Sequence, residues 1–294
     1  MDIFLQLMVS GIAVGGVYAL IALGFVLIYK ATNIINFATG EFMMIGAYLL
    51  YTLLVMVECP VVPAFLLVMS GATLLGFLVE RAILRHMLGQ PAISIVMVTI
   101  GLAYFLTGLA EVIWSPDYKF FPAIFPRKPI HLGFAIVRAN MFYGFVVAMV
   151  MVVVFSLLFK FAKVGVAMRA TANDQMAAYS MGINVRRMFT LAWGFGAIAA
   201  ALGGVIIGNI GGIRPDLGKI GLKIFPVVIL GGLDSIAGAV LGGFIVGILE
   251  NLAGGYLDPY FGGGIKDLAP FVALVLILMV KPYGLFGKKE IERL

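Results

Sequence analysis

The sequence predicts an all-α protein, a polytopic bundle of transmembrane helices, and two observations carry that prediction. Hydrophobic residues make up 63% of the 294 positions and charged residues only 12%, and the mean hydropathy is +1.12. A soluble domain of ordinary composition is about half apolar and about a quarter charged. The second observation is that several almost uncharged stretches reach the ~20 residues needed to span a hydrocarbon core about 30 Å thick.

The apolar stretches predict eight or nine crossings in a single transmembrane domain over residues 1–294. The longest are Ile3–Tyr29, Val61–Val79, Ala92–Ala110, Ala139–Phe159 and Met188–Ile213. Shorter ones lie at Phe42–Val57, Ile224–Leu233, Ser235–Leu249 and Leu268–Val280. The chain divides into approximate halves at 1–159 and 188–287, separated by a basic loop at 160–187.

Basic residues lie in the connections, so the net charge of +6 indicates membrane topology and not nucleic-acid binding. Three connections are basic and are expected in the cytoplasm: Glu80–Pro91 with Arg81 and Arg85, the 160–187 loop with Lys160, Lys163, Arg169, Arg186 and Arg187, and the tail with Lys281, Lys288, Lys289 and Arg293. Because five spans precede the 160–187 loop, we expect the N-terminus outside. Ser115–Arg138 is rich in Pro and aromatic residues, and we expect it to form an ordered outer cap although it carries Lys119, Arg127, Lys128 and Arg138.

The residues do not assemble a catalytic or metal site. Cys59 is the only cysteine, and His86 and His131 are too few and too isolated for zinc. The pairs Gly218-Lys219 and Gly287-Lys288 lack the upstream glycine and the following hydroxyl of a phosphate-binding loop. Energy for any transport must therefore come from an ion gradient or from a partner that hydrolyses ATP.

Polar residues interrupt the apolar pattern once in each half. Asn36 to Glu41 follows the first span, and Gly231 to Asp234 ends a ten-residue apolar stretch that contains Pro226. Ten residues cover only about 15 Å as a helix, and broken helices occur at membrane depth only where protein or water surrounds them. The candidates for lining a path across the membrane are therefore Asn36, Thr39, Gly40, Glu41, Met44, Gly231, Gly232 and Asp234. Alternatively, both interruptions are ordinary interfacial turns, with Glu41, Glu111 and Glu250 at a headgroup boundary.

The two halves also resemble each other. A gapless offset of 192 residues matches eight positions over 39, from Gly11 with Gly203 to Leu49 with Leu241. If Ile3–Tyr29 starts outside and Met188–Ile213 starts in the cytoplasm, the halves are inverted, which is a common plan for transporters. Both regions are rich in glycine, so chance identity is the alternative.

The 160–187 loop is expected to contain one short amphipathic helix. Thr171 is a suitable N-cap, with Asn173 and Asp174 in the first turn, and Gly182 is a suitable C-terminal stop. Met176, Tyr179 and Ile183 form one apolar stripe. A helix of about ten residues is marginal alone in water. It therefore either lies on the inner leaflet or, as its small side chains favour, inserts into a groove of another protein.

Four segments resemble the permeases of bacterial branched-chain amino acid ABC transporters of the LivH type. They are Gly15–Gly24, Asn36–Tyr48, Arg169–Asn184 and Pro226–Leu241, and the resemblance runs from about residue 5 to residue 287. It implies a type II-like importer permease with two inverted halves and discontinuous helices, in the bacterial inner membrane. It also implies that the C-terminus and the 160–187 loop are cytoplasmic.

The resemblance implies a transport subunit that is not an enzyme and binds no cofactor or metal, with ATP and magnesium on partner ATPases. The implied partners are two cytosolic ATPases, a second homologous permease, a periplasmic binding protein and the bilayer. The residues implied to couple to an ATPase are Arg169, Ala170, Thr171, Asn173, Asp174, Met176, Ala177, Tyr179, Met181, Gly182 and Ile183. The implied substrates are leucine, isoleucine and valine. Alternatives are urea, short amides or aromatic acids, and the rival mechanisms are an ion-driven carrier or a passive channel.

Overall fold

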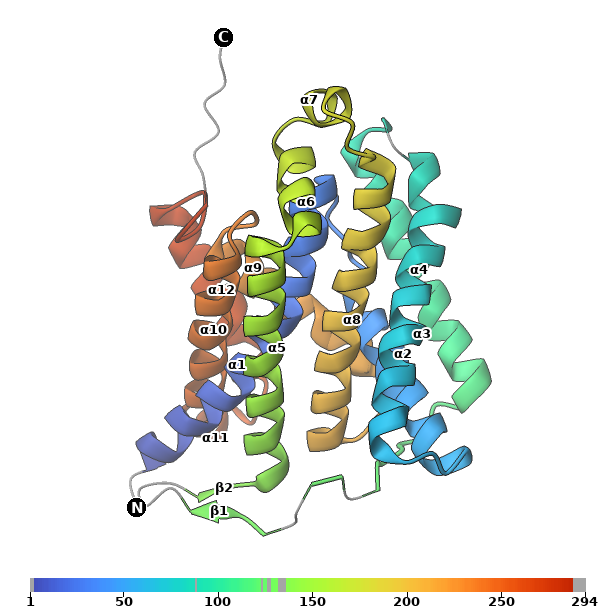
Figure 1. Ribbon diagram of the computed structural model, residues 1–294. Helices are drawn as coiled ribbons and strands as arrows, with labels where there is room; N and C mark the ends of the chain where they lie inside the picture. The colour runs from blue at the N-terminus through green and yellow to red at the C-terminus, as the bar shows by residue number, and fades with distance from the viewer. Residues whose placement is uncertain (1–2, 88, 123, 126–127, 132–135, 288–294) are drawn as a thin grey trace.

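The computed structural model describes residues 3–87, 89–122, 124–125, 128–131 and 136–287 as a bundle of long helices (Figure 1). Within these residues, seven helical segments are long and apolar enough to cross a membrane. They are α1 (Ile3–Thr32), α2 (Thr39–Tyr51) continued by the π-helical turn η1 (Thr52–Met56), α3 (Val61–Ala82) with the short 3-10 turn η2 (Leu84–Met87), α4 (Ala92–Trp114), α5 (Ala139–Phe161), α8 (Val185–Gly211) and α10 (Ile236–Tyr256).

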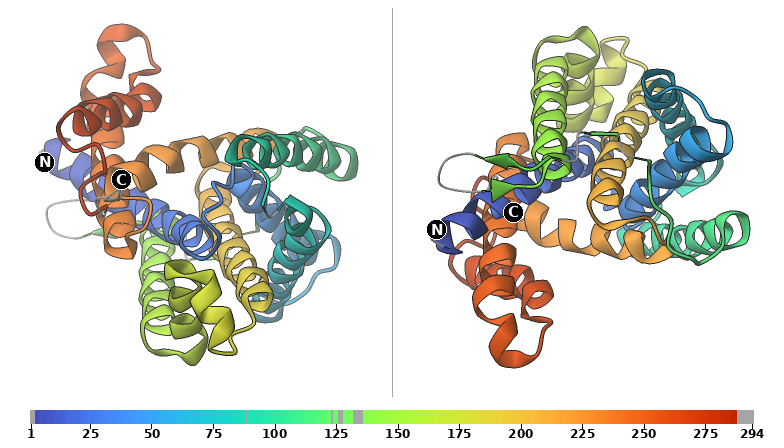
Figure 2. Two further views of the ribbon diagram at one scale, coloured as in Figure 1. Left: turned by 90° about the horizontal axis from the view of Figure 1, so that it is seen from above. Right: turned by 90° about the horizontal axis from the view of Figure 1, so that it is seen from below.

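The remaining elements are short. They are β1 (Ile130–His131), β2 (Ile136–Val137), α6 (Lys163–Asn173), α7 (Gln175–Ser180), η3 (Pro215–Ile220), α9 (Gly221–Gly231), α11 (Asp258–Phe261) and α12 (Ile265–Val280). α9 has 11 residues and α12 has 16, so two of the predicted crossings are shorter than a full span. The α12 helix rises about 24 Å, whereas α9 runs across the bundle between α8 and α10 (Figure 2).

The centre of the bundle is built on α1, which is buried along most of its length and packs against α10, α8 and α5. Helices associate closely in a membrane where small residues let the backbones approach. A Cβ on Gly15 would lie 2.8 Å from the Gly243 carbonyl oxygen of α10, and a Cβ on Gly24 would lie 3.0 Å from the Gly196 carbonyl oxygen of α8. Viewed along the bundle, α3, α4, α5 and α12 lie around this centre (Figure 2).

The two ends of the bundle differ (Figure 1). The N-terminus and the β1–β2 hairpin lie at one end, which we call the N-terminal end, and α7 lies at the other, the α7 end. The segment predicted as a cap crosses the N-terminal end, where Lys119 and Ile213 exchange backbone hydrogen bonds of 3.0 and 2.8 Å. Pro126 and Arg127 of this segment, and Lys288, Lys289 and Arg293 of the tail, lie outside the described residues.

The gapless repeat is wrong at the level of residues. α1 is continuous, whereas the positions paired with it, 195–224, contain the end of α8, a turn, η3 and the start of α9. The matches arose because both segments supply glycine to the same closely packed centre. At the level of direction, α1 runs toward the α7 end and α8 runs away from it, as inverted halves require (Figure 1).

Candidate coupling loop and translocation path

The 160–187 loop lies at the α7 end and contains two helices instead of one. α6 ends at Asn173, Asp174 is extended at φ −156° and ψ 111°, and α7 begins at Gln175. The Asp174 carboxylate accepts a hydrogen bond from the backbone N–H of Ala177 at 2.9 Å, so Asp174 is the N-cap of α7.

The prediction that Thr171 is this N-cap is wrong. Thr171 is fully buried inside α6, where its hydroxyl donates to the Ala167 carbonyl at 3.0 Å. Thr and Asp are both good N-caps, so the sequence could not decide between them. Thr171 is buried as part of α6, which continues to Asn173, so the N-cap of the next helix, α7, is Asp174.

Gly182 ends α7, as predicted. Its φ is +80°, its N–H donates to the Tyr179 carbonyl at 2.9 Å, and the Ile183 N–H donates to the Ala178 carbonyl at 3.0 Å. These two bonds form a Schellman motif, which favours glycine because other residues strain at positive φ. A Cβ at Gly182 would meet no atom within 4 Å, so substitution there strains the backbone without a clash.

Arg169 ties α6 to the last turn of α5. Its guanidinium donates to the carbonyls of Phe159 and Lys160, the latter at 3.1 Å, and lies 5.5 Å from the centroid of the Phe159 ring. Carbonyls in the last turn of a helix lack intrahelical partners, so Arg169 both satisfies them and links the two helices. A displacement of α6 is therefore transmitted to α5.

The outer face of α7 and of the turn after it is apolar and exposed. Met176, Tyr179 and Met181 are 78%, 73% and 83% exposed, whereas Ala178 is buried against the bundle. The other predicted coupling residues that are exposed or half-buried are Arg169, Ala170, Asn173, Asp174, Ala177, Gly182 and Ile183. A short helix that presents large apolar side chains in this way marks a contact surface.

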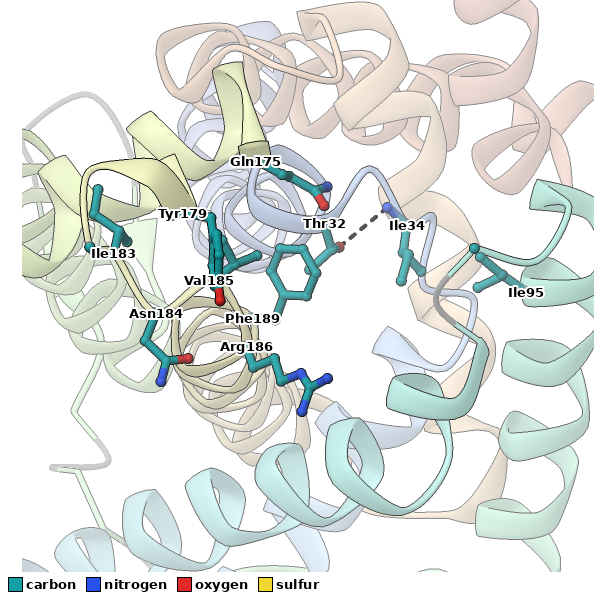
Figure 3. A pocket seen from close by; sticks show the side chains of 12 residues that line it. Thr32, Ile34, Ile95, Gln175, Tyr179, Ile183, Asn184, Val185, Arg186 and Phe189 are labelled. Carbon is teal, nitrogen blue, oxygen red and sulfur yellow. Dashed lines mark hydrogen bonds between the residues drawn. The ribbon is translucent and has the colours of Figure 1, made fainter. Parts of the chain in front are cut away.

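A cleft of about 970 Å³ lies beside α7 (Figure 3). It is bounded by Thr32 at the end of α1 and Ile34 just after it, by Ile95 of α4, and by Tyr179 and Phe189. The 160–187 loop therefore lies next to the interruption that follows α1.

The interruption between α1 and α2 leaves two polar atoms unpaired. Asn33 has φ +55°, and α1 ends there. The Asn36 Oδ1 accepts from the Ala38 N–H at 3.0 Å, and the Thr39 hydroxyl donates to the Asn36 carbonyl at 2.9 Å. In the part of the chain that the structure describes, neither Nδ2 of Asn36 nor Oε2 of Glu41 has a hydrogen-bond partner, although both atoms are buried. Leaving a buried polar atom unpaired is costly.

The same interruption packs on the first turn of α9. A Cβ on Gly40 would lie 1.9 Å from the Gly218 carbonyl oxygen and 3.0 Å from the Gly221 Cα. The rings of Phe37 and Phe225 stack with their centroids 4.4 Å apart. Gly40 is thus required for the approach of α2 to η3 and α9.

The interruption between α9 and α10 is closed. The residues after α12 pair with it, because the Leu285 N–H donates to the Leu230 carbonyl at 2.8 Å and the Phe286 N–H donates to the Gly231 carbonyl at 3.0 Å. The Asp234 carbonyl accepts from Lys30 Nζ at 3.2 Å. Gly232 adopts φ +107° in this turn.

The predicted path residues therefore form two groups. The first group packs near the first turn of α9 and consists of Asn36, Thr39, Gly40 and Glu41, with buried Met44 further along α2. Gly231, Gly232 and Asp234 lie at the end of α9, and the 11 residues of α9 separate the groups, a rise of about 16 Å. Gly231 serves packing, because a Cβ there would lie 2.2 Å from the Gly238 carbonyl oxygen.

Sequence comparison identifies the family. The family described as "branched-chain amino acid transport system / permease component" matches residues 7–281. The chain belongs to this family.

Its relatives match along almost their whole length. The high-affinity branched-chain amino acid transport system permease protein BraD of Pseudomonas aeruginosa is 31% identical in an alignment of 304 positions that covers 99% of this chain and 98% of BraD. LivH of Escherichia coli, named in the same way, is 31% identical in an alignment of 305 positions that covers 99% of this chain and 97% of LivH. A probable LivH of Methanocaldococcus jannaschii is 31% identical over 293 residues, with 94% and 90% covered.

A solved structure shares the fold. PsaBC from Streptococcus pneumoniae in complex with Fab aligns with a TM-score of 0.52 over 96% of this chain and 93% of that chain. The sequence identity is 14%, so the likeness concerns the fold alone.

Sequence reasoning missed a buried charge network in this permease. Glu250 is 2% exposed and lies inside the helix bundle. Its carboxylate accepts from the Tyr18 hydroxyl at 2.6 Å and from Lys223 Nζ at 2.7 Å, and Lys223 also donates to Asp267 at 2.6 Å. The available signal was Lys223 beside an apolar stretch, because ionisable residues inside membrane segments are normally paired.

A second missed network joins α3 to α8 of the permease. Arg85 donates to both carboxylate oxygens of Glu80 at 2.9 and 3.2 Å, and the Thr190 hydroxyl donates to the same carboxylate at 2.7 Å. Glu80 is 2% exposed. Its partner on α8 lies 110 residues further along the chain, so no local pattern indicated the contact.

Proposed function

We propose that this permease is the membrane-spanning subunit of an ATP-driven ABC importer that moves leucine, isoleucine and valine. The observation that carries the proposal is the near full-length match to BraD and LivH, which are named as permease proteins of branched-chain amino acid transport systems. No other substrate class receives comparable support.

The proposed assembly places the bacterial inner membrane around the bundle, with the α7 end in the cytoplasm. The basic residues of the Glu80–Pro91 turn and of the 160–187 loop support this orientation, which puts the N-terminus outside. Two cytosolic ABC ATPases, with ATP and magnesium, work at the α7 end. A second homologous permease lies beside this one, and a periplasmic binding protein docks at the N-terminal end.

Coupling begins at the exposed face of Met176, Tyr179 and Met181. In this proposal an ATPase groove receives that face, and closure of the ATPases displaces α6 and α7. Arg169 passes the displacement to the end of α5, and the direct chain connection passes it to α8. Because α8 packs on α1, α2 and α3, the movement reaches the interruption after α1.

The proposed path runs past that interruption. An amino acid carries an ammonium group and a carboxylate, and two buried unpaired atoms of opposite character lie there. Oε2 of Glu41 is an acceptor suited to the ammonium, and Nδ2 of Asn36 is a donor suited to the carboxylate. Buried Met44 offers a flexible apolar neighbour for the branched side chain. An importer must release its substrate, so a few such contacts are sufficient.

The test is Gly182→Val in the complete importer reconstituted in liposomes, with leucine uptake and ATP hydrolysis measured together. Positive φ at Gly182 predicts a distorted α7 and uptake below about a tenth of the wild-type value, a loss of about 1.4 kcal/mol in coupling, with hydrolysis retained. Gly262→Val is the matched control, because Gly262 also has positive φ and open space around it, at +75°, but lies after α11 at the N-terminal end. Normal uptake by Gly182→Val would contradict the coupling role.

The chain reconstituted alone separates the rival mechanisms. A substrate-coupled proton or sodium flux would indicate an ion-driven carrier, and a symmetric flux that ignores nucleotide would indicate a passive channel. The importer predicts no flux of leucine without the ATPases. A mild-detergent pull-down should recover two ATPases and a second permease.

A further inference from the structure

A second cleft, of about 520 Å³, opens at the α7 end between α3 and α8. Four arginines line it: Arg81, Arg85, Arg186 and Arg187. It touches the cleft beside α7 at Asn184 and Arg186, which line both. Figure 3 shows Arg186 extending away from the start of α8.

The charge of this cleft is largely unbalanced. Glu80 is the carboxylate that pairs with Arg85. None of the ion pairs among the described residues involves Arg81, Arg186 or Arg187, and these three side chains are exposed. The Glu80 pair also fixes Arg85 through two hydrogen bonds, so one guanidinium of the cleft is held in place before any ligand arrives.

The start of α8 adds to the positive potential. Asn184 lines the cleft and caps this 27-residue helix by accepting from the Arg187 N–H at 3.0 Å. The N-terminus of a long helix carries a partial positive charge. An anion in the cleft would therefore meet both guanidinium groups and the helix dipole.

Apolar side chains continue the cleft along the membrane-facing side of α3. Phe77 and Leu191 line the cleft itself. Leu74 and Leu78, which are 60% and 55% exposed, lie seven and three residues before Arg81 and so share its helix face. A free anion or an acidic protein surface would use the arginines but not this apolar continuation, whereas a phospholipid uses both.

We propose that this cleft binds an anionic phospholipid, with the phosphate headgroup among Arg81, Arg85, Arg186 and Arg187 and an acyl chain along Leu74 and Leu78. Arginine suits phosphate because its planar guanidinium donates in pairs. The bound lipid contacts the first turn of α8, directly after the 160–187 loop, and so steadies the base of that loop. The inference does not depend on the transported substrate.

The experiment uses the full chain, purified in a zwitterionic detergent and titrated with phosphatidylglycerol or phosphatidylcholine while bound lipid is counted by native mass spectrometry. The variant is Arg81→Gln with Arg187→Gln, both exposed positions. The control is Lys281→Gln, an exposed basic residue that follows α12 and lies outside the cleft. A monodisperse gel-filtration peak and an unchanged thermal midpoint verify folding.

The wild type and the control should retain phosphatidylglycerol in preference to phosphatidylcholine. The double variant should bind phosphatidylglycerol about 25-fold more weakly, since each basic residue at a membrane surface contributes about a factor of five. Equal binding by variant and wild type would overturn the proposal. So would complete displacement of the lipid by millimolar inorganic phosphate, which would indicate a soluble-anion site.

Discussion

The interruption after α1 and the interruption after α9 look alike in the sequence and differ in the structure. Each replaces apolar residues with glycine and short polar side chains. After α9, the residues that follow α12 pair with Leu230 and Gly231, and Ser235 caps α10 by accepting from the Gly238 N–H at 3.0 Å. After α1, Asn36 and Glu41 keep buried atoms unpaired.

The difference teaches that an interruption is not by itself a path. The second one is a closed turn that anchors the end of the bundle, so its glycines serve packing. The first one carries unmet hydrogen-bonding capacity, which a substrate can satisfy. The two predicted halves of the path therefore differ, and the substrate contact that we propose lies at the first one.

Gly40→Val should lower stability more than any other variant here, because the added side chain would clash where the first interruption packs on η3. The added atoms would meet the Gly218 carbonyl oxygen, and backbone cannot move aside as a side chain can. We expect a loss of about 3 kcal/mol or more in stability, seen as an absent monodisperse peak in fluorescence-detected gel filtration.

Gly101→Val is its control, because a Cβ at Gly101 of α4 has nothing within 4 Å. Equal recovery of the two variants would show that α2 does not approach η3 as closely as described.

The second-largest effects are expected from replacing Glu250 or Glu41 with glutamine, which tests whether the two carboxylates have different roles. Glu250→Gln removes the charge that pairs with Lys223 at 2.7 Å, and we expect the free energy of unfolding to fall by about 1.5–3 kcal/mol, the range for hydrogen bonds to charged groups. Glu41→Gln removes no hydrogen bond from Oε2, so its stability should change by less than about 0.5 kcal/mol.

Glu41→Gln should lower leucine uptake strongly although it changes stability little. Loss of its negative charge weakens the contact with the substrate ammonium, and we expect uptake to fall about tenfold, equivalent to about 1.4 kcal/mol. The measurement is uptake by the reconstituted importer at matched protein density. If Glu41→Gln lowers the thermal midpoint as much as Glu250→Gln does, Glu41 has a structural role and the comparison between the interruptions fails.

Thr99→Val should have the smallest effect on stability. The Thr99 hydroxyl of α4 accepts from the Phe37 N–H at 3.3 Å and so ties the first interruption to its neighbour. Its loss should cost about 1 kcal/mol, read as a lower thermal midpoint. Thr73→Val on α3 is the control, since among the described residues the Thr73 hydroxyl donates to the Met69 carbonyl of its own helix, at 2.8 Å, and to no neighbouring element. If Thr99→Val lowers the thermal midpoint no more than Thr73→Val does, the hydrogen bond between Thr99 and Phe37 does not stabilise the first interruption.

Several features followed from local sequence alone. Apolar stretches predicted the long helices, because backbone polar groups in lipid must be satisfied within a helix. Gly182 was identified as the end of α7 because positive φ is a local property. The four resembling segments gave the family, and the resemblance implied the discontinuous helices.

Other features were decided by tertiary structure. The choice of Asp174 over Thr171 as N-cap depended on burial of Thr171 against the bundle. Arg169 turned to the end of α5, a contact that no helix pattern contains. The 192-residue offset failed because shared glycine reflects shared close packing and not the order of the elements.

The sequence by itself determined that this protein is a membrane permease and where its chain is interrupted. Tertiary structure alone decided which interruption is closed and which buried carboxylate is paired, Glu250 with Tyr18 and Lys223, while Oε2 of Glu41 has no partner among the described residues. The physical reason is that hydropathy and backbone conformation are properties of neighbouring residues. Burial and hydrogen-bond pairing depend on groups that the fold brings together, here 232 residues apart for Tyr18 and Glu250.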